Sequence, residues 1–354
     1  MDLRKRFSLI KKPRSVESAA RFESIMRDVL PGYKPSAARN KSLEAAMKLL
    51  GRRRLAPALR RFNSVIKKSP EPRALSGRAL CWWEKADYGR ALADLDRAVK
   101  ADGENENLLV LRSQLKSEIA SMHRAGYRAS DRLRWYGLDE PDRDWGAEAV
   151  ADLTRAIAVK PDAPPLYVER ALANIYRDDY PAALADCDRA LELGRDDSEL
   201  RTHRALALFN LDRPEEAAAD ARLAVDKGHR DAWPKLILGW IAASEEDYRG
   251  AMTHFRAALA ADRKSHHALA NIGRCYTELG DFNKASDFID RALKAEPYDA
   301  YGHYALALWF ERQDSPGEAL WTCLNAALTC PADSRLMEKI SELILKGVYP
   351  AEPD

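Results

Sequence analysis

Seven histidines are the first residues to test for metal binding or acid–base chemistry, because imidazole does both near neutral pH. They are His123, His203, His229, His254, His266, His267 and His303. No two of them have the H-E-x-x-H or H-x-H spacing that places two imidazole nitrogens on one metal ion. We therefore expect each histidine to be solvated or to pack in a core, and we expect no metal and no cofactor.

Two pairs of acids are candidates for general acid–base work: Asp94 with Asp96, and Asp186 with Asp188. Residues two apart on a helix are separated by about 200° around its axis. The two carboxylates of each pair therefore face different sides and cannot share a proton or a metal ion. A solvated helix surface is the expected setting for them.

The five cysteines also carry no recognisable chemistry. They are Cys81, Cys187, Cys275, Cys323 and Cys330, an odd and scattered set without a C-x-x-C pair. Neither a disulfide framework nor a zinc site is indicated, so buried apolar packing is expected. The chain also lacks a G-x-x-x-x-G-K-[ST] or G-x-G-x-x-G phosphate loop and a G-x-S-x-G elbow. We therefore do not expect an enzyme.

The elements that carry these residues follow one repeat. Alanines that mark it stand at Ala58, Ala91, Ala149, Ala183, Ala217, Ala251, Ala285 and Ala319. Their spacing is 34 residues in five of seven steps, 33 in the first and 58 in the second. Prolines that stop a helix stand twelve residues after four of the markers, at Pro70, Pro161, Pro297 and Pro331. A fixed period of this length predicts a stack of two-helix units.

The copy at 266–299 shows the unit most clearly. Its first helix has one apolar face, formed by Leu269, Ile272, Gly273 and Tyr276. Gly280 and Asp281 supply the turn, because glycine tolerates the backbone conformation of a bend. A second amphipathic helix follows, with Ala285, Phe288, Ile289, Ala292 and Leu293 on one stripe, and it ends at Pro297. Small residues such as Gly273 let the two helices approach closely.

This pattern resembles the tetratricopeptide repeat (TPR) family, most specifically in Leu269, Ile272, Gly273, Tyr276, Ala285, Ala292 and Pro297. Looser copies lie at about 39–72, 72–105, 164–197, 198–231, 232–265 and 300–333. The resemblance implies an all-α, right-handed α-solenoid of about eight antiparallel helix hairpins with capping helices at both ends. The expected organisation is an N-terminal arm with a capping helix (1–38), two units (39–105), an interrupted unit (106–163), five units (164–333) and a capping helix with a tail (334–354).

The interrupted unit contains 24 extra residues. We expect a long amphipathic helix over 107–123 and a loop over 137–146, with a basic and aromatic segment between them. That segment includes Arg128, Arg132, Arg134, Trp135 and Tyr136. A lengthened hairpin packed on the outside explains the insertion. A partner-contacting element is the alternative, and both can hold.

The TPR resemblance also implies a ligand groove along the first helix of each unit. The residues at the ligand-facing positions of the family are Leu80, Trp83, Leu172, Ile175, Tyr176, Leu206, Phe209, Trp233, Leu236, Ile237, Trp240, Asn271, Arg274, Tyr301, Tyr304 and Leu308. This lining predicts a groove for a peptide or helix of a protein partner, since aromatic anchors supply much of an interface's binding energy. Tighter stacking between units, or occupation by the chain's own terminal segment, remains open. The Lys and Asn residues of the family's clamp for chaperone tails are absent.

A basic N-terminal region is the remaining feature. Residues 1–73 hold 20 Lys and Arg against 6 Asp and Glu, a net charge of +14, whereas the rest holds 37 against 49, a net charge of −12. Its clusters include Arg4, Lys5, Arg6, Lys11, Lys12, Arg52, Arg53 and Arg54. They could bind an acidic partner, nucleic acid or an anionic membrane surface. They could equally form a solvated helix face and an arm that docks on the acidic body.

These observations favour a non-enzymatic protein–protein interaction scaffold. The alternative is a nucleic-acid or membrane-surface adaptor that acts through the basic region. No apolar run approaches the ~18 residues of a spanning helix, and the N-terminus lacks the apolar core of a signal peptide. The expected location is therefore the cytoplasm.

Overall fold

The computed structural model describes residues 41–124, 138, 140, 143–228, 232–328, 330 and 333–351, and all of the regular elements in this part of the chain are helices. The first five are α3 (Lys41–Gly51), α4 (Leu55–Lys68), α5 (Pro72–Glu84), α6 (Tyr88–Ala101) and α7 (Glu106–Arg124). The next six are α9 (Trp145–Val159), α10 (Pro164–Ile175), α11 (Tyr180–Glu192), α12 (Ser198–Asn210), α13 (Pro214–Asp226) and α14 (Trp233–Ser244). The last six are α15 (Tyr248–Ala261), α16 (His266–Glu278), α17 (Phe282–Ala295), α18 (Ala300–Glu311), α19 (Pro316–Ala327) and α20 (Ser334–Leu345).

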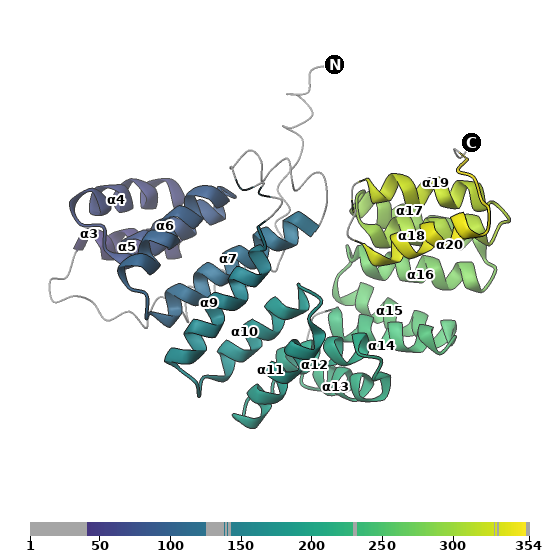
Figure 1. Ribbon diagram of the computed structural model, residues 1–354, viewed down its shortest axis with the longest axis horizontal. Coiled ribbons are helices and arrows are strands. Elements are labelled where there is room, and N and C mark those ends of the chain that lie inside the picture. The colour runs from purple at the N-terminus through teal and green to yellow at the C-terminus, as the bar shows by residue number, and fades with distance from the viewer. Residues whose placement is uncertain are drawn as a thin grey trace, which may run out of the picture. The chain divides into compact units, whose positions relative to one another are not determined.

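Seven helix hairpins account for the seven predicted repeats: α3–α4, α5–α6, α10–α11, α12–α13, α14–α15, α16–α17 and α18–α19 (Figure 1). The long helix expected over 107–123 is α7, and the helix expected after the last repeat is α20. The predicted loop ends earlier than expected, because α9 already begins at Trp145, whose side chain is fully buried. The N-terminal arm and capping helix expected within 1–38 lie outside the described residues.

The turn inside each hairpin has a common local cause. At the end of a first helix one residue adopts a left-handed conformation, as Ala86, Glu246 and Gly280 do with φ of 58°, 62° and 77°. In four of the seven hairpins an aspartate then caps the second helix, as where the Asp281 carboxylate accepts a hydrogen bond from the Lys284 amide. This cap satisfies a helix N–H that would otherwise lack a partner. The predicted turn at Gly280 and Asp281 is therefore confirmed.

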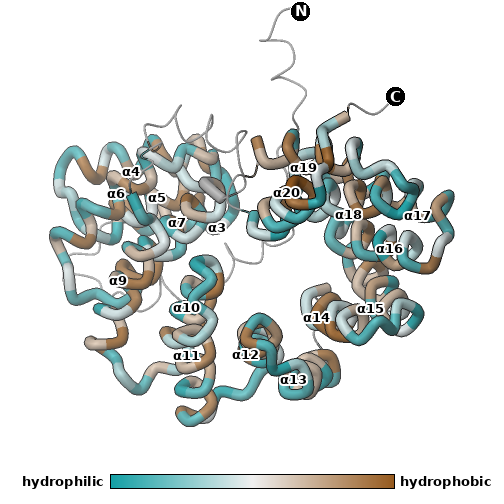
Figure 2. Tube along the Cα trace, turned by 45° about the vertical axis from the view of Figure 1, so that its right-hand side comes forward, coloured by the Kyte–Doolittle hydropathy of each residue, from teal (hydrophilic) through white to brown (hydrophobic). Residues whose placement is uncertain are grey.

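Alanine at the marker position is a packing residue. All eight marker alanines have no exposed surface. Glycines serve the same purpose in the first helices: a Cβ at Gly239 would lie 2.4 Å from the Phe255 ring, and one at Gly273 would lie 2.7 Å from Ile289. Polar and apolar stretches alternate along each helix in Figure 2, as one-sided burial requires. The small residues therefore recur with the period of the repeat because each unit needs them where its two helices approach closely.

Successive hairpins stack through two kinds of helix contact. The helix pairs α10–α12, α12–α14, α14–α16, α16–α18 and α18–α20 are in contact, and each second helix also packs on the first helix of the next unit. In a stack of this kind the first helices form the inner layer. Side chains on α12, α14, α16, α18 and α20 are thereby brought onto one continuous face.

Buried ion pairs tie the two helices of several hairpins together. The Arg78 guanidinium donates two hydrogen bonds of 2.7 Å to Asp94, and Arg170 donates to Asp186 at 2.6 and 3.0 Å. The two aspartates are only 3% and 5% exposed. The expectation of a solvated helix surface is therefore wrong for Asp94 and Asp186. It fails because an arginine 16 residues earlier, on the paired helix, reaches each carboxylate.

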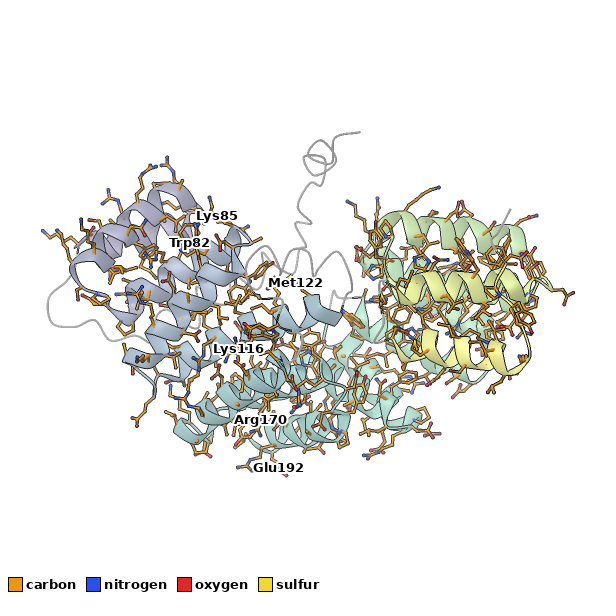
Figure 3. All side chains as sticks on the ribbon, turned by 45° about the horizontal axis from the view of Figure 1, so that its top comes forward. Trp82, Lys85, Lys116, Met122, Arg170 and Glu192 are labelled. Atoms are coloured by element: carbon orange, nitrogen blue, oxygen red, sulfur yellow. The ribbon has the colours of Figure 1, made fainter. Side chains whose placement is uncertain are left out.

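The same position carries related pairs in other units. Asp220 accepts hydrogen bonds of 2.6 Å from both Arg201 and Arg204. In the interrupted unit Lys116 of α7 replaces the arginine and lies 3.0 Å from Asp152 of α9. Lys116 and Arg170 are labelled in Figure 3. The chain divides into two compact units, Met1–Leu115 and Lys116–Asp354, so the pairs at Lys116, Arg170 and Asp220 lie in the second unit.

A half-buried ion pair beside Lys116, between Arg143 and Glu148, leads to a prediction on pH. Glu148 accepts a 2.6 Å hydrogen bond from Arg143 and lies 3.0 Å from Lys116, and these contacts lower the pKa of its carboxyl group to about 2. A lowered pKa adds stability above the unfolded value, and that stability is lost as pH falls through the folded one. We expect Glu148→Gln to lower the free energy of unfolding by about 1 kcal/mol or less at pH 7, since the side chain is one-third exposed. Urea unfolding measures this difference in the free energy of unfolding between the variant and the wild type, and we expect it to become smaller from pH 5 toward pH 2. If the difference in free energy stays constant over this pH range, the ion pair does not lower the pKa of Glu148 and the prediction is wrong.

The five cysteines pack as predicted. All of them are buried and unpaired with one another. Burial raises the pKa of the Cys187 and Cys323 thiols to about 12, so neither is a thiolate near neutral pH. None of the helices in the described residues combines the length and the apolar character that a membrane crossing requires. The division of the chain into the five segments expected above stays a prediction.

Candidate functional site

An aromatic ladder runs along the first helices of four consecutive units. We use this name for Phe209 of α12, Trp233 and Trp240 of α14, His267 of α16 and Tyr301 of α18. Trp240 stacks on Phe209 with ring centroids 6.0 Å apart and on Tyr301 at 6.2 Å. Trp233 lies edge-on to Trp240 at 6.1 Å and 5.5 Å from His267. His267 meets Tyr301 at 4.6 Å, which closes the ladder. Aromatic pairs at such separations stabilise by about 0.5–1.5 kcal/mol each beyond their burial.

Exposure divides the ladder into a buried centre and accessible edges. Trp240 is 8% exposed, and its indole Nε1 has no hydrogen-bond partner among the described residues. Phe209, Trp233 and Tyr301 are half-buried and pack against the core cluster that contains Trp240. Trp240 thus joins the units, whereas the three half-buried rings present surface that a ligand can cover.

The predicted groove residues as a whole also divide into buried and half-buried side chains. Those that are buried are Leu80, Ile175, Leu236, Ile237, Trp240 and Asn271. Four of them, Ile175, Leu236, Ile237 and Trp240, belong to one core cluster, and the Asn271 amide donates to the His267 carbonyl on its own helix. These six therefore differ from the expectation of a surface role, because their side chains are buried inside the helical stack. The half-buried ones are Trp83, Leu172, Tyr176, Leu206, Phe209, Trp233, Arg274, Tyr301, Tyr304 and Leu308.

The basic region and the insertion are described only in part. Arg52, Arg53 and Arg54 are exposed where α3 meets α4, and Arg53 pairs with Glu84 at 2.8 Å. The predicted residues of the N-terminal arm and the insertion lie outside the described residues. They are Arg4, Lys5, Arg6, Lys11, Lys12, Arg128, Arg132, Arg134, Trp135 and Tyr136.

A cavity of about 490 Å³ lies at the C-terminal end of the ladder. Its lining comes from the beginnings of α16, α18 and α20 and from other segments of the second unit: Ser121, Tyr176, His266, His267, Glu296, Tyr298, Asp299, Ala300, Tyr301, Cys330, Asp333 and Arg335. The Arg335 guanidinium lies 3.5 Å from the centre of the Tyr301 ring and donates two hydrogen bonds to Asp333. Aromatic, carboxyl and imidazole groups therefore share one recess.

His266, His267 and Asp299 form a compact cluster in this cavity. One potential ligand atom from each lies within 4.8 Å of the other two. The His266 Nε2 atom is 3.7 Å from the Asp299 Oδ1 atom, while Asp299 Oδ2 accepts a hydrogen bond from the Gly302 amide. The Nδ1 atom of His267 is buried and has no hydrogen-bond partner in the described part of the chain. Asp299 thus faces the two imidazole rings, and one ring nitrogen of His267 is available for a ligand.

Burial governs the protonation of these groups. It lowers the pKa of the His267 imidazole to about 3, so this ring is neutral in ordinary buffers. Burial also raises the pKa of the Asp299 carboxyl group, against the opposing effects of His266 and Arg335. A neutral imidazole can bind a metal ion without first losing a proton.

The sequence analysis missed this cluster because it tested only spacings within one helix. Ser265 caps α16, and Asp299, 34 residues later, is the corresponding cap of α18. Equivalent positions of neighbouring repeats lie side by side, so a residue next to one cap comes close to the next cap. A search at separations of 32 and 33 residues would have found it.

The architecture first defines the class of protein: an α-solenoid of stacked helix hairpins, as predicted. The chain matches the tetratricopeptide repeat family over residues 43–106 and 242–308. It is a tetratricopeptide repeat protein. Repeats of this kind are protein–protein interaction modules, so protein partners are expected.

The chain is also similar to known repeat proteins. It is 35% identical over 63 residues to the RNA polymerase-associated protein CTR9 of Caenorhabditis elegans. The aligned segment covers 17% of this chain and 5% of that protein. Human IFIT1, solved as a dimer with m7Gppp-AAAA, aligns with a TM-score of 0.59 at 16% identity over 85% of this chain and 71% of that chain. A TPR protein from Parabacteroides merdae aligns with a TM-score of 0.55 at 14% identity, covering 80% of this chain and 98% of that one. At these identities the structures support the fold alone.

Proposed function

We propose that this protein is a non-enzymatic interaction scaffold that binds a peptide or helix of a partner protein along the aromatic ladder. The observation that carries the proposal is a row of half-buried aromatic side chains, Phe209, Trp233 and Tyr301, on first helices of neighbouring units. These rings are already held by stacking, so covering them costs little side-chain entropy. Large aromatic surfaces that lose water on binding supply most of the energy of an interface.

The charge and polarity of the ladder favour a protein ligand over a nucleic acid. A surface for nucleic acid carries several Lys or Arg side chains that neutralise phosphates. The ladder has one guanidinium at its end, Arg335, and this group is already paired with Asp333. An apolar or aromatic segment of a partner is the ligand that fits.

A peptide-display experiment on the purified full chain tests the proposal. Peptides selected on the wild type should carry aromatic or aliphatic anchors, and Trp233→Ala should weaken their binding about tenfold or more, measured by fluorescence polarisation. Trp233 is chosen over Trp240 because truncating the buried Trp240 would disturb the core. The matched control is Trp321→Ala, which removes a half-buried tryptophan from the second helix α19 and should leave affinity unchanged.

Two outcomes would overturn the proposal. One is equal binding by the Trp233→Ala variant and the wild type. The other is that no peptide is selected while the chain binds an oligonucleotide with steep salt dependence, and an Arg52→Ala/Arg54→Ala double variant loses that binding. The second result would show that the basic region, and not the aromatic ladder, is the binding surface.

A further inference from the structure

We infer that His266, His267 and Asp299 form a binding site for one divalent transition-metal ion of the zinc type at the end of the aromatic ladder. The ligand types fit such an ion: imidazole nitrogen and carboxylate oxygen bind zinc at about 2.0–2.2 Å. Magnesium and calcium are disfavoured because they require a set of oxygen ligands, and only one of the three residues in this cluster is a carboxylate.

The distances require only a small adjustment. Four-coordinate zinc with ligands at about 2.0–2.1 Å places those ligands roughly 3.3–3.5 Å apart. His266 Nε2 and Asp299 Oδ1 are already 3.7 Å apart, and no pair in the cluster exceeds 4.8 Å. Rotation of the two imidazole rings about their side-chain bonds can close the remaining gap, while Asp299 keeps its bond to the Gly302 amide.

The backbone holds the three ligands from two rigid elements. His266 and His267 are the first two residues of α16, and Asp299 is the residue that caps α18. The hydrogen bond from Gly302 fixes the orientation of the carboxylate, as partners of metal ligands commonly do. Both helices belong to the second compact unit and are in contact.

The charges around the cluster also favour a cation. Besides Asp299, the cavity contains Glu296 and Asp333, and its one guanidinium, Arg335, is bonded to Asp333. No lysine or arginine of the described chain forms an ion pair with Asp299. A metal ion would compensate this carboxylate and provide the His267 ring with a partner. With three protein ligands, at least one coordination position is left for water or for an oxygen of a molecule in the cavity.

Zinc binding by the purified full chain tests the site without reference to any peptide. Isothermal titration with Zn²⁺ should give one ion per chain, and a Co²⁺-loaded sample should show the visible absorption bands of a four-coordinate site. His266→Ala and Asp299→Asn should each weaken Zn²⁺ binding by about tenfold or more and abolish the Co²⁺ bands. Asparagine is chosen at 299 because its side-chain oxygen can still cap α18, which circular dichroism would verify.

The matched control is His303→Ala. His303 lies on α18 near the cluster, but its Nε2 atom is 2.9 Å from the Pro297 carbonyl and it does not line the cavity. This variant should bind Zn²⁺ as the wild type does. The inference is overturned if the wild type binds no stoichiometric Zn²⁺, or if a His266→Ala/Asp299→Asn double variant binds it undiminished.

Discussion

Arg170→Met should lower the free energy of unfolding by about 3–5 kcal/mol, since it leaves a buried carboxylate without its cation. Asp186 is 5% exposed and receives both of its short hydrogen bonds from Arg170. Among the described residues, the hydrogen bond that would remain to it is the one from the Asn174 amide at 3.3 Å. Methionine is chosen because it keeps most of the length of the arginine side chain and removes only its charge and hydrogen bonds. Urea unfolding followed by circular dichroism measures the loss.

Two further variants separate the buried charge from ordinary packing. Arg204→Met should cost clearly less, because Asp220 would keep its 2.6 Å bond from Arg201 and the released Asp188 is half exposed. An Arg170→Met/Asp186→Leu double variant should regain most of the stability, since both charges are then gone. Equal losses in Arg170→Met and Arg204→Met, with no recovery in the double variant, would show that the ion pair is not the cause.

Phe255→Ala should lower the free energy of unfolding by about 3–5 kcal/mol through loss of apolar contact and creation of a cavity. Phe255 of α15 has no exposed surface, and its ring lies directly against the backbone of Gly239 on α14. The hairpin closes here by fitting a large ring onto a residue that lacks a side chain. Neighbouring side chains cannot fill the space without separating the two helices.

Gly239→Ala provides the complementary test. The added methyl group would lie 2.4 Å from the Phe255 ring, so the ring must move, and the expected cost is about 1–3 kcal/mol. In the Phe255→Ala background the same substitution should cost almost nothing, because the methyl group enters vacated space. A double-mutant cycle in urea measures this coupling. Additive losses of the two substitutions would contradict the packing described here.

Some features of the candidate site were visible in the sequence and others were not. Family positions identified Trp233 and Trp240 together as groove residues, yet only Trp233 presents surface, because Trp240 is enclosed by rings from α12 and α18. The pairing of Arg170 with Asp186 was missed although its separation of 16 residues recurs in Arg78 with Asp94. Sequence reasoning examined each helix by itself, whereas such pairs join the two helices of a hairpin.

The sequence by itself determined the architecture of this protein: the period, the two helices of each unit, the turn at Gly280 and the burial of the marker alanines and the cysteines. These features depend on residues within about one repeat of each other, so periodicity and local propensity suffice to predict them. Only the tertiary structure decided which aromatic rings remain accessible and that His266, His267 and Asp299 meet. Those outcomes depend on how far one unit turns relative to the next, and that angle is set by packing across the whole interface between units.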